Sequence, residues 1–170
     1  MLSSDEYFLV IYIGVIGASS CDEKIATFAY KVGMAVAESG AILVCGGMGG
    51  VMTQACRGAR EAEGITIGIL PGDSRLSGNP YLTYAIPTGL GEARNSIVVK
   101  SSDAVVAVDG SYGTLSEIAF ALKWGKPVAG IGTWELKNHT GETAPITYFK
   151  DPVSAVKWAV ESASIGKREI

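Results

Sequence analysis

Residues 8–17 read FLVIYIGVIG, an unbroken run of β-branched, aromatic and small residues. Such a run is typical of a parallel strand that is buried on both of its faces. A short polar turn, Ala18-Ser19-Ser20, follows it, and from Asp22 to Ser39 apolar residues recur at helical spacing. The stretch therefore predicts a buried strand, a tight turn and an amphipathic helix that ends at Gly40.

The same alternation of strand and helix continues along the chain. Residues 73–80 and 133–144 are polar and rich in turn formers, and we expect loops there. Strands separated by helices predict an α/β fold of three layers, a Rossmann-like, doubly wound parallel sheet with helices on both faces. We expect residues 1–170 to form a single domain of this kind. Its further strands are expected at residues 41–45, 65–70, 84–86, 104–108, 127–131 and 147–149, and its further helices at 51–63, 91–101, 114–124 and 152–163.

Composition fits one globular core and excludes several classes of protein. The 170 residues include 22 glycines without a periodic repeat, which excludes collagen, and 48% hydrophobic residues, which excludes a disordered chain. Lys and Arg number 14 against 17 Asp and Glu, a net charge of −3. Because duplex nucleic acids are bound through many cationic contacts to phosphates, we expect no nucleic-acid partner.

The most apolar segment is too short to cross a membrane. It runs over residues 7–18, whereas a spanning helix needs about 18 or more apolar residues. Asp5 and Glu6 precede it, where a secretory signal carries Lys or Arg. We therefore expect a cytoplasmic protein without a membrane partner.

Cysteine and histidine exclude further chemistry. Cys21, Cys45 and Cys56 are odd in number and lack C-x-x-C spacing, so they predict neither a disulfide framework nor a zinc site, and no metal site is expected. Cys45 lies in an apolar run, which favours a core position. His139 is the single histidine, and residues 110–113 do not fit G-x-S-x-G, so a serine hydrolase triad is not expected.

Three glycine-bearing loops, at residues 14–20, 46–50 and 110–113, each follow a predicted strand. In parallel sheets ligands bind beyond the carboxyl ends of the strands, where these loops would meet. No Lys-Ser or Lys-Thr follows the glycines as in a Walker A motif, and the full G-x-G-x-x-G is absent. Each glycine could serve only a tight turn. Together the three loops favour an anion or nucleotide site.

Thr114 and Glu117 allow two interpretations. Their spacing fits a capping box, in which Thr114 caps a helix and Glu117 bonds back to the cap. Alternatively, the same helix start binds a phosphate through its free N–H groups, and Glu117 faces the ligand as a general acid or base.

Arg94 also has two interpretations. On a helix it could be a solvated charge. At the entry to the same half of the sheet, its guanidinium could clamp a phosphate or polarise a leaving group.

In their order along the chain, these motifs resemble the lysine-decarboxylase-like Rossmann superfamily. The resemblance rests on Gly17-Ala18-Ser19-Ser20, the loop 46–52, Arg94 and Gly113-Thr114-x-x-Glu117, and it spans roughly residues 11–132. Its well-understood members, the cytokinin-activating phosphoribohydrolases or LOG enzymes, carry P-G-G-x-G-T-x-x-E and an upstream Arg-Lys. The resemblance implies that Arg94 and Glu117 are catalytic in N-glycosidic cleavage of a nucleoside 5′-monophosphate. Nothing resembles a pyridoxal-phosphate lysine site, so lysine decarboxylation is not expected.

The chain departs from the LOG motif at three positions. Asp109 stands in place of the proline, Ser111 in place of the second glycine, and Asn95 in place of the lysine. The loop 46–52 and the stretch 93–128 are more similar to the molybdenum-cofactor carrier-like branch, whose members have a similar fold and bind a ligand. The three loops and this resemblance together predict that the ligand is bound by Gly17, Ser19, Ser20, Gly46, Gly47, Gly49, Gly50, Met52, Asp109, Gly110, Ser111, Gly113 and Thr114.

Two functions of different kinds follow. The first is a cytoplasmic binding protein for a small phosphorylated ligand, either a nucleoside monophosphate or a molybdopterin-type molecule, with no required cofactor. The alternative is a LOG-type phosphoribohydrolase, and a third and plainer interpretation is a structural domain with three turn-forming loops. The resemblance also implies a homodimer or larger homo-oligomer. The sequence adds only the small or apolar helix faces of Ala55 with Ala59 and Phe120 with Trp124, which could equally pack on their own sheet.

Overall fold

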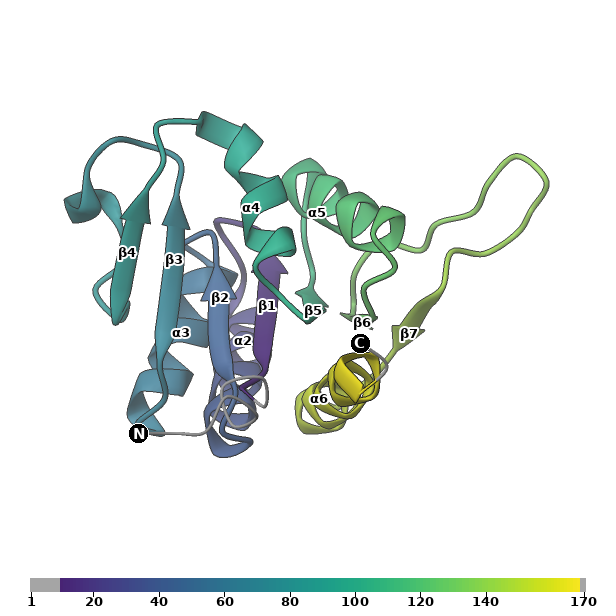
Figure 1. Ribbon diagram of the computed structural model, residues 1–170, viewed down its shortest axis with the longest axis horizontal. Helices are drawn as coiled ribbons and strands as arrows, with labels where there is room; N and C mark the ends of the chain where they lie inside the picture. The colour runs from purple at the N-terminus through teal and green to yellow at the C-terminus, as the bar shows by residue number, and fades with distance from the viewer. Residues whose placement is uncertain (1–9, 169–170) are drawn as a thin grey trace.

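The structure is a computed structural model of the chain, and it describes residues 10–168 (Figure 1). Strands and helices alternate as the sequence predicts. They follow one another as β1 (Tyr12–Gly17), α2 (Glu23–Glu38), β2 (Ile42–Cys45), α3 (Val51–Glu61), β3 (Thr66–Leu70), the 3₁₀ turn η1 (Arg75–Ser77), β4 (Tyr84–Pro87), the 3₁₀ turn η2 (Gly91–Arg94), α4 (Asn95–Lys100), β5 (Ala104–Val108), α5 (Tyr112–Lys123), β6 (Val128–Ile131), β7 (Ile146–Tyr148) and α6 (Pro152–Arg168).

The described strands form one seven-stranded sheet in the order β4-β3-β2-β1-β5-β6-β7, and all of its strand pairs are parallel. The chain builds outward from β1 to β4, returns to the centre and then builds outward on the other side from β5. β1 and β5 are therefore neighbours, paired from Ile13 with Ala104 to Gly17 with Val108. The strand order reverses between these two strands, which is where open α/β sheets bind ligands.

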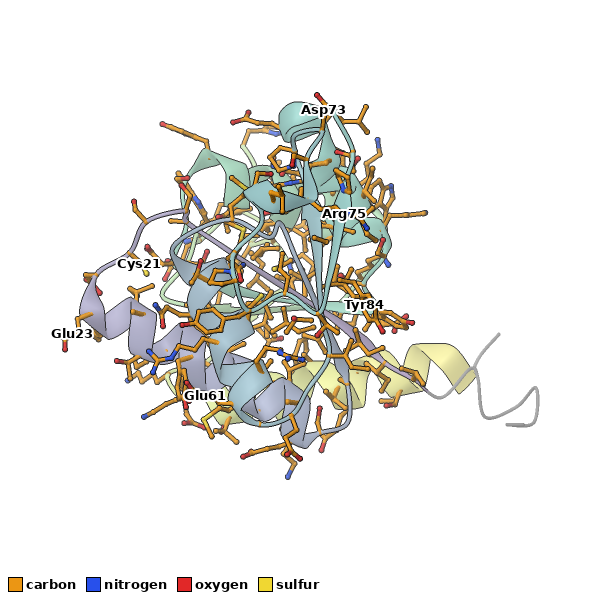
Figure 2. All side chains as sticks on the ribbon, turned by 90° about the vertical axis from the view of Figure 1, so that its left-hand side faces the viewer. Cys21, Glu23, Glu61, Asp73, Arg75 and Tyr84 are labelled. Atoms are coloured by element: carbon orange, nitrogen blue, oxygen red, sulfur yellow. The ribbon has the colours of Figure 1, made fainter. Side chains whose placement is uncertain are left out.

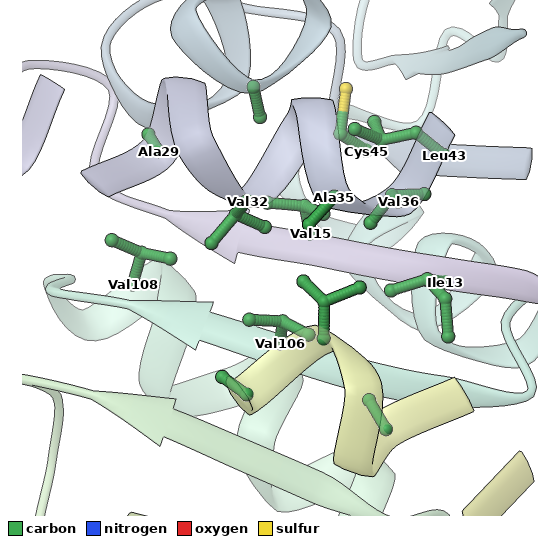
Figure 3. Close-up of a cluster of buried hydrophobic side chains, with 14 of the residues drawn as sticks. Ile13, Val15, Ala29, Val32, Ala35, Val36, Leu43, Cys45, Val106 and Val108 are labelled. Carbon is green, nitrogen blue, oxygen red and sulfur yellow. The ribbon is translucent and has the colours of Figure 1, made fainter. Parts of the chain in front are cut away.

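Helices cover both faces of the sheet (Figure 1), and two apolar clusters fill the space beneath them. Figure 3 shows the cluster beneath α2 and α6. Alternate residues of β1 and β5 face opposite clusters: Val15 and Val106 pack under α2 and α6, whereas Ile16 and Val105 pack under α4 and α5. Because both faces are buried, every residue of β5 is buried. The predicted α/β fold of three layers is confirmed.

The sequence places most elements correctly and misjudges several ends. Of the predicted strand 8–17, Phe8 and Leu9 lie outside the described residues, and β1 begins at Tyr12. The predicted helix 91–101 opens with the 3₁₀ turn η2, the predicted loop 73–80 contains η1, and α6 continues beyond residue 163. Helix α5 begins two residues earlier than predicted because Ser111, in extended conformation, takes the N-cap position. Because of this shift, Thr114 lies inside α5 and is not the residue at its start.

Helices α2 and α3 pack unusually closely, because glycines remove side chains from their contact. A Cβ on Gly33 would lie 1.9 Å from the backbone oxygen of Ala55, and one on Gly58 would lie 2.0 Å from the backbone oxygen of Tyr30. Ala55 and Ala59 are completely buried in the cluster beneath these helices, so this face packs within the chain. Phe120 and Trp124 stack with ring centroids 5.1 Å apart against the other cluster.

At the left side of the sheet in Figure 1, β4 forms an edge strand whose first residue, Tyr84, is 59% exposed. Figure 2 shows the Tyr84 side chain at the surface of that edge. Within residues 10–168, no helix combines the length and the apolar character that crossing a membrane requires.

The close packing of α2 on α3 predicts an unusual effect of Gly33→Ala. In an ordinary helix interior this change stabilises by about 1 kcal/mol. Here the added methyl meets backbone, so we expect the free energy of unfolding to fall by about 2 kcal/mol or more, measured by urea denaturation. The control is Gly72→Ala, because a Cβ at Gly72 meets nothing within 4 Å. Equal stabilities of the two variants would contradict this account of the helix contact.

Candidate functional site

A cavity of about 250 Å³ opens at the carboxyl ends of β1 and β5, where the strand order reverses. Loops and helix ends from both halves of the sheet meet in its wall. The residues that line it are Gly17, Ser19, Met52, Pro71, Glu92, Arg94, Asn95, Ser111, Gly113, Thr114 and Glu117.

The amino end of α5 forms one wall of the cavity and offers it hydrogen-bond donors. Ser111, the N-cap residue, makes no capping hydrogen bond with its side chain. The first N–H groups of an α-helix have no acceptor within the helix, and they carry the positive end of its dipole. Thr114 adds a hydroxyl that is 2% exposed and whose Oγ1 has no hydrogen-bond partner. Donors in this arrangement suit an anion.

The capping-box interpretation of Thr114 and Glu117 is wrong. Thr114 is the third residue of α5 rather than its cap, and Glu117 lies one turn further along the helix. Both side chains are buried and line the cavity. The sequence spacing that fits a capping box therefore places both groups on the side of the helix that lines the cavity.

Arg94, the last residue of η2, extends a buried guanidinium across the floor of the cavity, and its interpretation as a solvated charge is wrong. Its Nη1 donates to Oδ1 of Asn95, and its Nη2 donates to the backbone oxygen of Gly46 at 3.4 Å. Its Nε is buried without a hydrogen-bond partner. Buried guanidinium groups are ordinarily fully hydrogen-bonded, so the unpartnered Nε is a donor whose usual partner the described residues do not supply.

Glu117 faces Arg94, with 4.0 Å between Oε1 and Nη1. Burial raises the pKa of Glu117 from 4.5 to about 8, and the positive charge of Arg94 opposes this rise without cancelling it. At neutral pH the carboxyl is therefore mostly protonated. Arg94 then keeps its charge beside a neutral hydrogen-bonding group, and the exposed side chain of Glu92 also lines the cavity.

The glycines of the 46–50 loop let two loops and an arginine approach one another. A Cβ on Gly46 would lie 2.6 Å from Nη2 of Arg94 and 2.9 Å from Sδ of Met52. Gly50 has a φ of 57°, and a Cβ there would lie 2.4 Å from the backbone oxygen of Ala18. That same oxygen accepts the first N–H of α3, from Val51, at 3.0 Å. The loops after β1 and β2 are therefore in close backbone contact with each other.

The turn between β5 and α5 has a special backbone conformation. Asp109 has a φ of 52°, in the left-handed region, and Gly110 has a φ of 124°. The Asp109 N–H donates to the backbone oxygen of Ile131 at 3.0 Å, and the Thr133 hydroxyl donates to the backbone oxygen of Asp109 at 2.6 Å. Proline is fixed near −65°, so the residue that replaces the LOG proline takes a φ that proline cannot adopt.

The predicted site residues divide into two groups. One group lines the cavity: Gly17, Ser19, Met52, Arg94, Ser111, Gly113, Thr114 and Glu117. The other does not line it and includes the residues that shape the backbone behind it: Ser20, Gly46, Gly47, Gly49, Gly50, Asp109 and Gly110.

Sequence reasoning missed Pro71, Glu92 and Asn95, which also line the cavity. Pro71 directly follows β3, and the rule that ligands bind at strand ends could have identified it. Asn95 attracted notice only as a departure from a motif, yet its Nδ2 donates to Oγ of Ser116 at 3.1 Å and its Oδ1 holds Arg94.

A larger cavity, of about 610 Å³, lies beside the edge strand β4. Residues of β3, of β4 and of the segment that connects them line it, with Arg75 as the single charged residue in this lining. It lies along the strands rather than beyond their carboxyl ends, and it contains no carboxylate or helix amino end. The smaller cavity therefore remains the candidate site.

Comparison with known proteins places the chain among relatives of the same architecture. The family model of the SLOG cluster4 family matches residues 10–156. The chain belongs to the SLOG cluster4 family. A protein of Archaeoglobus fulgidus, described as uncharacterized, is 48% identical over 154 residues, covering 91% of this chain and 97% of its own length.

Solved structures of other proteins are similar to this SLOG cluster4 chain in both sequence and fold. The molybdenum cofactor binding protein from the phototrophic bacterium Rippkaea orientalis is 37% identical, with a TM-score of 0.80 over 88% of this chain and 94% of its own. The Moco carrier protein from Chlamydomonas reinhardtii is 35% identical, with a TM-score of 0.78 over 92% and 99% of the two chains. The resemblance to the carrier-like branch of the superfamily is thus confirmed.

The raised pKa of Glu117 predicts a pH-dependent stability. Between about pH 4.5 and pH 8 the folded state keeps a proton that the unfolded state has lost, so the free energy of unfolding falls as the pH rises through this window. One such group contributes a slope of at most about 1.4 kcal/mol per pH unit. Urea denaturation at several pH values should find this slope in the wild type and a flatter profile in Glu117→Gln.

The control for this measurement is Glu92→Gln, which removes an exposed carboxyl from the same cavity and should leave the slope unchanged. Parallel pH profiles of wild type and Glu117→Gln would show that Glu117 is ionised throughout the window and would contradict the interpretation.

Proposed function

We propose that this protein is a cytoplasmic binding protein for a small phosphorylated ligand of the pterin or nucleotide type. Two similar solved structures support this proposal, because they are named as a molybdenum cofactor binding protein and a Moco carrier protein. The cavity at the reversal of strand order is its ligand site. The homo-oligomeric state implied by the family resemblance belongs to the same proposal.

The observation that carries this proposal is a set of buried donors without partners around one cavity. Nε of Arg94 and Oγ1 of Thr114 are both buried, both unpartnered, and both on residues that line it. Leaving such a group unpaired costs about 1–3 kcal/mol, which a bound phosphate would recover. The uncapped amino end of α5 lies beside them and adds further donors.

The raised pKa of Glu117 favours holding a ligand over cleaving it. Cleavage of an N-glycosidic bond builds positive charge on the ribose, which an ionised carboxylate stabilises. With a pKa raised to about 8, Glu117 carries that charge in only a minority of molecules at neutral pH, and in the others it can donate a hydrogen bond to an oxygen of the ligand. A protonated Glu117 also avoids repelling a phosphate.

Binding of ribose 5-phosphate, measured by calorimetry near pH 7, tests the phosphate site. Arg94→Met removes the buried charge and should weaken binding at least tenfold, while Thr114→Val removes one hydroxyl at nearly constant volume and should weaken it about fivefold. The control is Arg60→Met, because Arg60 is exposed on α3 and does not line the cavity. Wild-type binding in both Arg94→Met and Thr114→Val would sink the assignment.

The phosphoribohydrolase alternative is favoured by one observation, that Arg94 and Glu117 lie side by side in the cavity lining, with 4.0 Å between Nη1 and Oε1. If it holds, incubation with AMP should release adenine and ribose 5-phosphate, and the rate should rise toward pH 8 as Glu117 ionises. We expect no release under conditions in which AMP is bound, as detected by chromatography. Turnover that Glu117→Ala abolishes and Arg60→Met retains would replace the binding proposal with the hydrolase.

A further inference from the structure

Two aromatic side chains, the exposed Tyr112 and the half-buried Trp134, contact each other at the start of α5, and Trp134 also packs against one of the two apolar clusters. Tyr112, the first residue of α5, lies between Ser111 and Gly113, which both line the cavity. It is 80% exposed, and its ring centroid is 5.8 Å from that of Trp134 at an interplanar angle of 36°.

The Trp134 side of this pair is held in place by hydrogen bonds. Its Nε1 donates to the backbone oxygen of Ser111 at 3.2 Å, and its own backbone oxygen accepts from the Tyr148 hydroxyl at 2.7 Å. The segment after β6 is thereby attached to the start of α5. The indole supports one side of Tyr112 and leaves most of the tyrosine open.

The size of the cavity indicates that a ligand extends beyond it. Ligand clefts usually measure about 300–1,000 Å³, whereas this cavity measures about 250 Å³. A phosphate with its attached sugar or short linker would fill such a space. A planar ring joined to that phosphate would then lie outside the cavity, and Tyr112 is an exposed aromatic residue between two residues of the cavity lining.

We propose that Tyr112, supported by Trp134, is a stacking platform for the planar heteroaromatic ring of a ligand whose phosphate binds at the amino end of α5. This inference rests on the proposed function and deepens it, because it restricts the ligand to phosphate esters that carry a flat ring. Aromatic faces stack on every such ring with little dependence on its substituents. The platform therefore selects a class of ligand, and the polar groups of the cavity select within it.

The test separates ring from phosphate by using three probes on the full chain: GMP, ribose 5-phosphate and guanosine. Guanine shares the amino-pyrimidinone ring of pterins, so GMP represents both ligand types. We expect Tyr112→Leu to weaken GMP and guanosine about tenfold and to leave ribose 5-phosphate within twofold, whereas Tyr112→Phe keeps all three within twofold. Affinities are measured by calorimetry, and thermal unfolding verifies that each variant is folded.

Tyr84→Leu is the matched control, because Tyr84 is an exposed tyrosine at the first residue of β4, away from the carboxyl ends of the strands (Figure 2). It should change none of the three affinities. Arg94→Met, in contrast, should weaken GMP and ribose 5-phosphate together.

The outcomes distinguish the platform from the phosphate site. Wild-type affinity for GMP in Tyr112→Leu, with the Arg94→Met loss intact, overturns the platform and leaves the proposed function standing. Equal weakening of GMP and ribose 5-phosphate in Tyr112→Leu also overturns the platform, since Tyr112 would then act on the shape of the helix start. Failure of the wild type to bind any of the three probes overturns both proposals.

Discussion

The pairing of β1 with β5 is the constraint on which the rest of the molecule depends. These two strands come from the beginning and the middle of the chain, and their parallel register joins the half that builds toward β4 to the half that builds toward β7. Gly17 and Val108, the last residues of β1 and β5, are paired. The loop after β1 and the start of α5 therefore lie close together. A buried, nearly all-apolar pair of strands thus places polar groups from distant segments around one cavity.

The chemistry of that cavity depends on two buried ionisable side chains. Arg94 and Glu117 are both nearly inaccessible to water and 4.0 Å apart. Two buried charges gain from each other only when their remaining hydrogen-bonding groups are satisfied, and here Nε of Arg94 is not. Protonation of Glu117 removes one of these two charges, so Arg94 remains as the charged member of the buried pair. That condition favours an anionic ligand over a cationic transition state.

Sequence reasoning was strongest where the pattern is local and repetitive. The run at residues 104–108 predicts β5 with both ends correct, because a strand buried on both faces leaves an unbroken apolar signal. It was weaker at α5, where Thr114 and Glu117 fit a local capping rule, and only the position of Ser111 at the helix start decides against it. The burial of Arg94 could not be predicted, since it depends on contacts such as the one with the backbone oxygen of Gly46, 48 residues away, which only the folded sheet brings to it.

The turn at Asp109 bears on how this site can change. A left-handed φ on a residue other than glycine costs roughly 1–2 kcal/mol, and here bonds to the backbone of Ile131 and from the hydroxyl of Thr133 hold it in place. The geometry of the ligand loop is therefore encoded partly in the neighbouring strand and the residue beyond it. The loop is not a transplantable module: grafted onto another parallel sheet without its β6 neighbour, the same amino acids would relax to a different path. Substitutions that change the path of this loop therefore require compensating substitutions in the segment that follows β6.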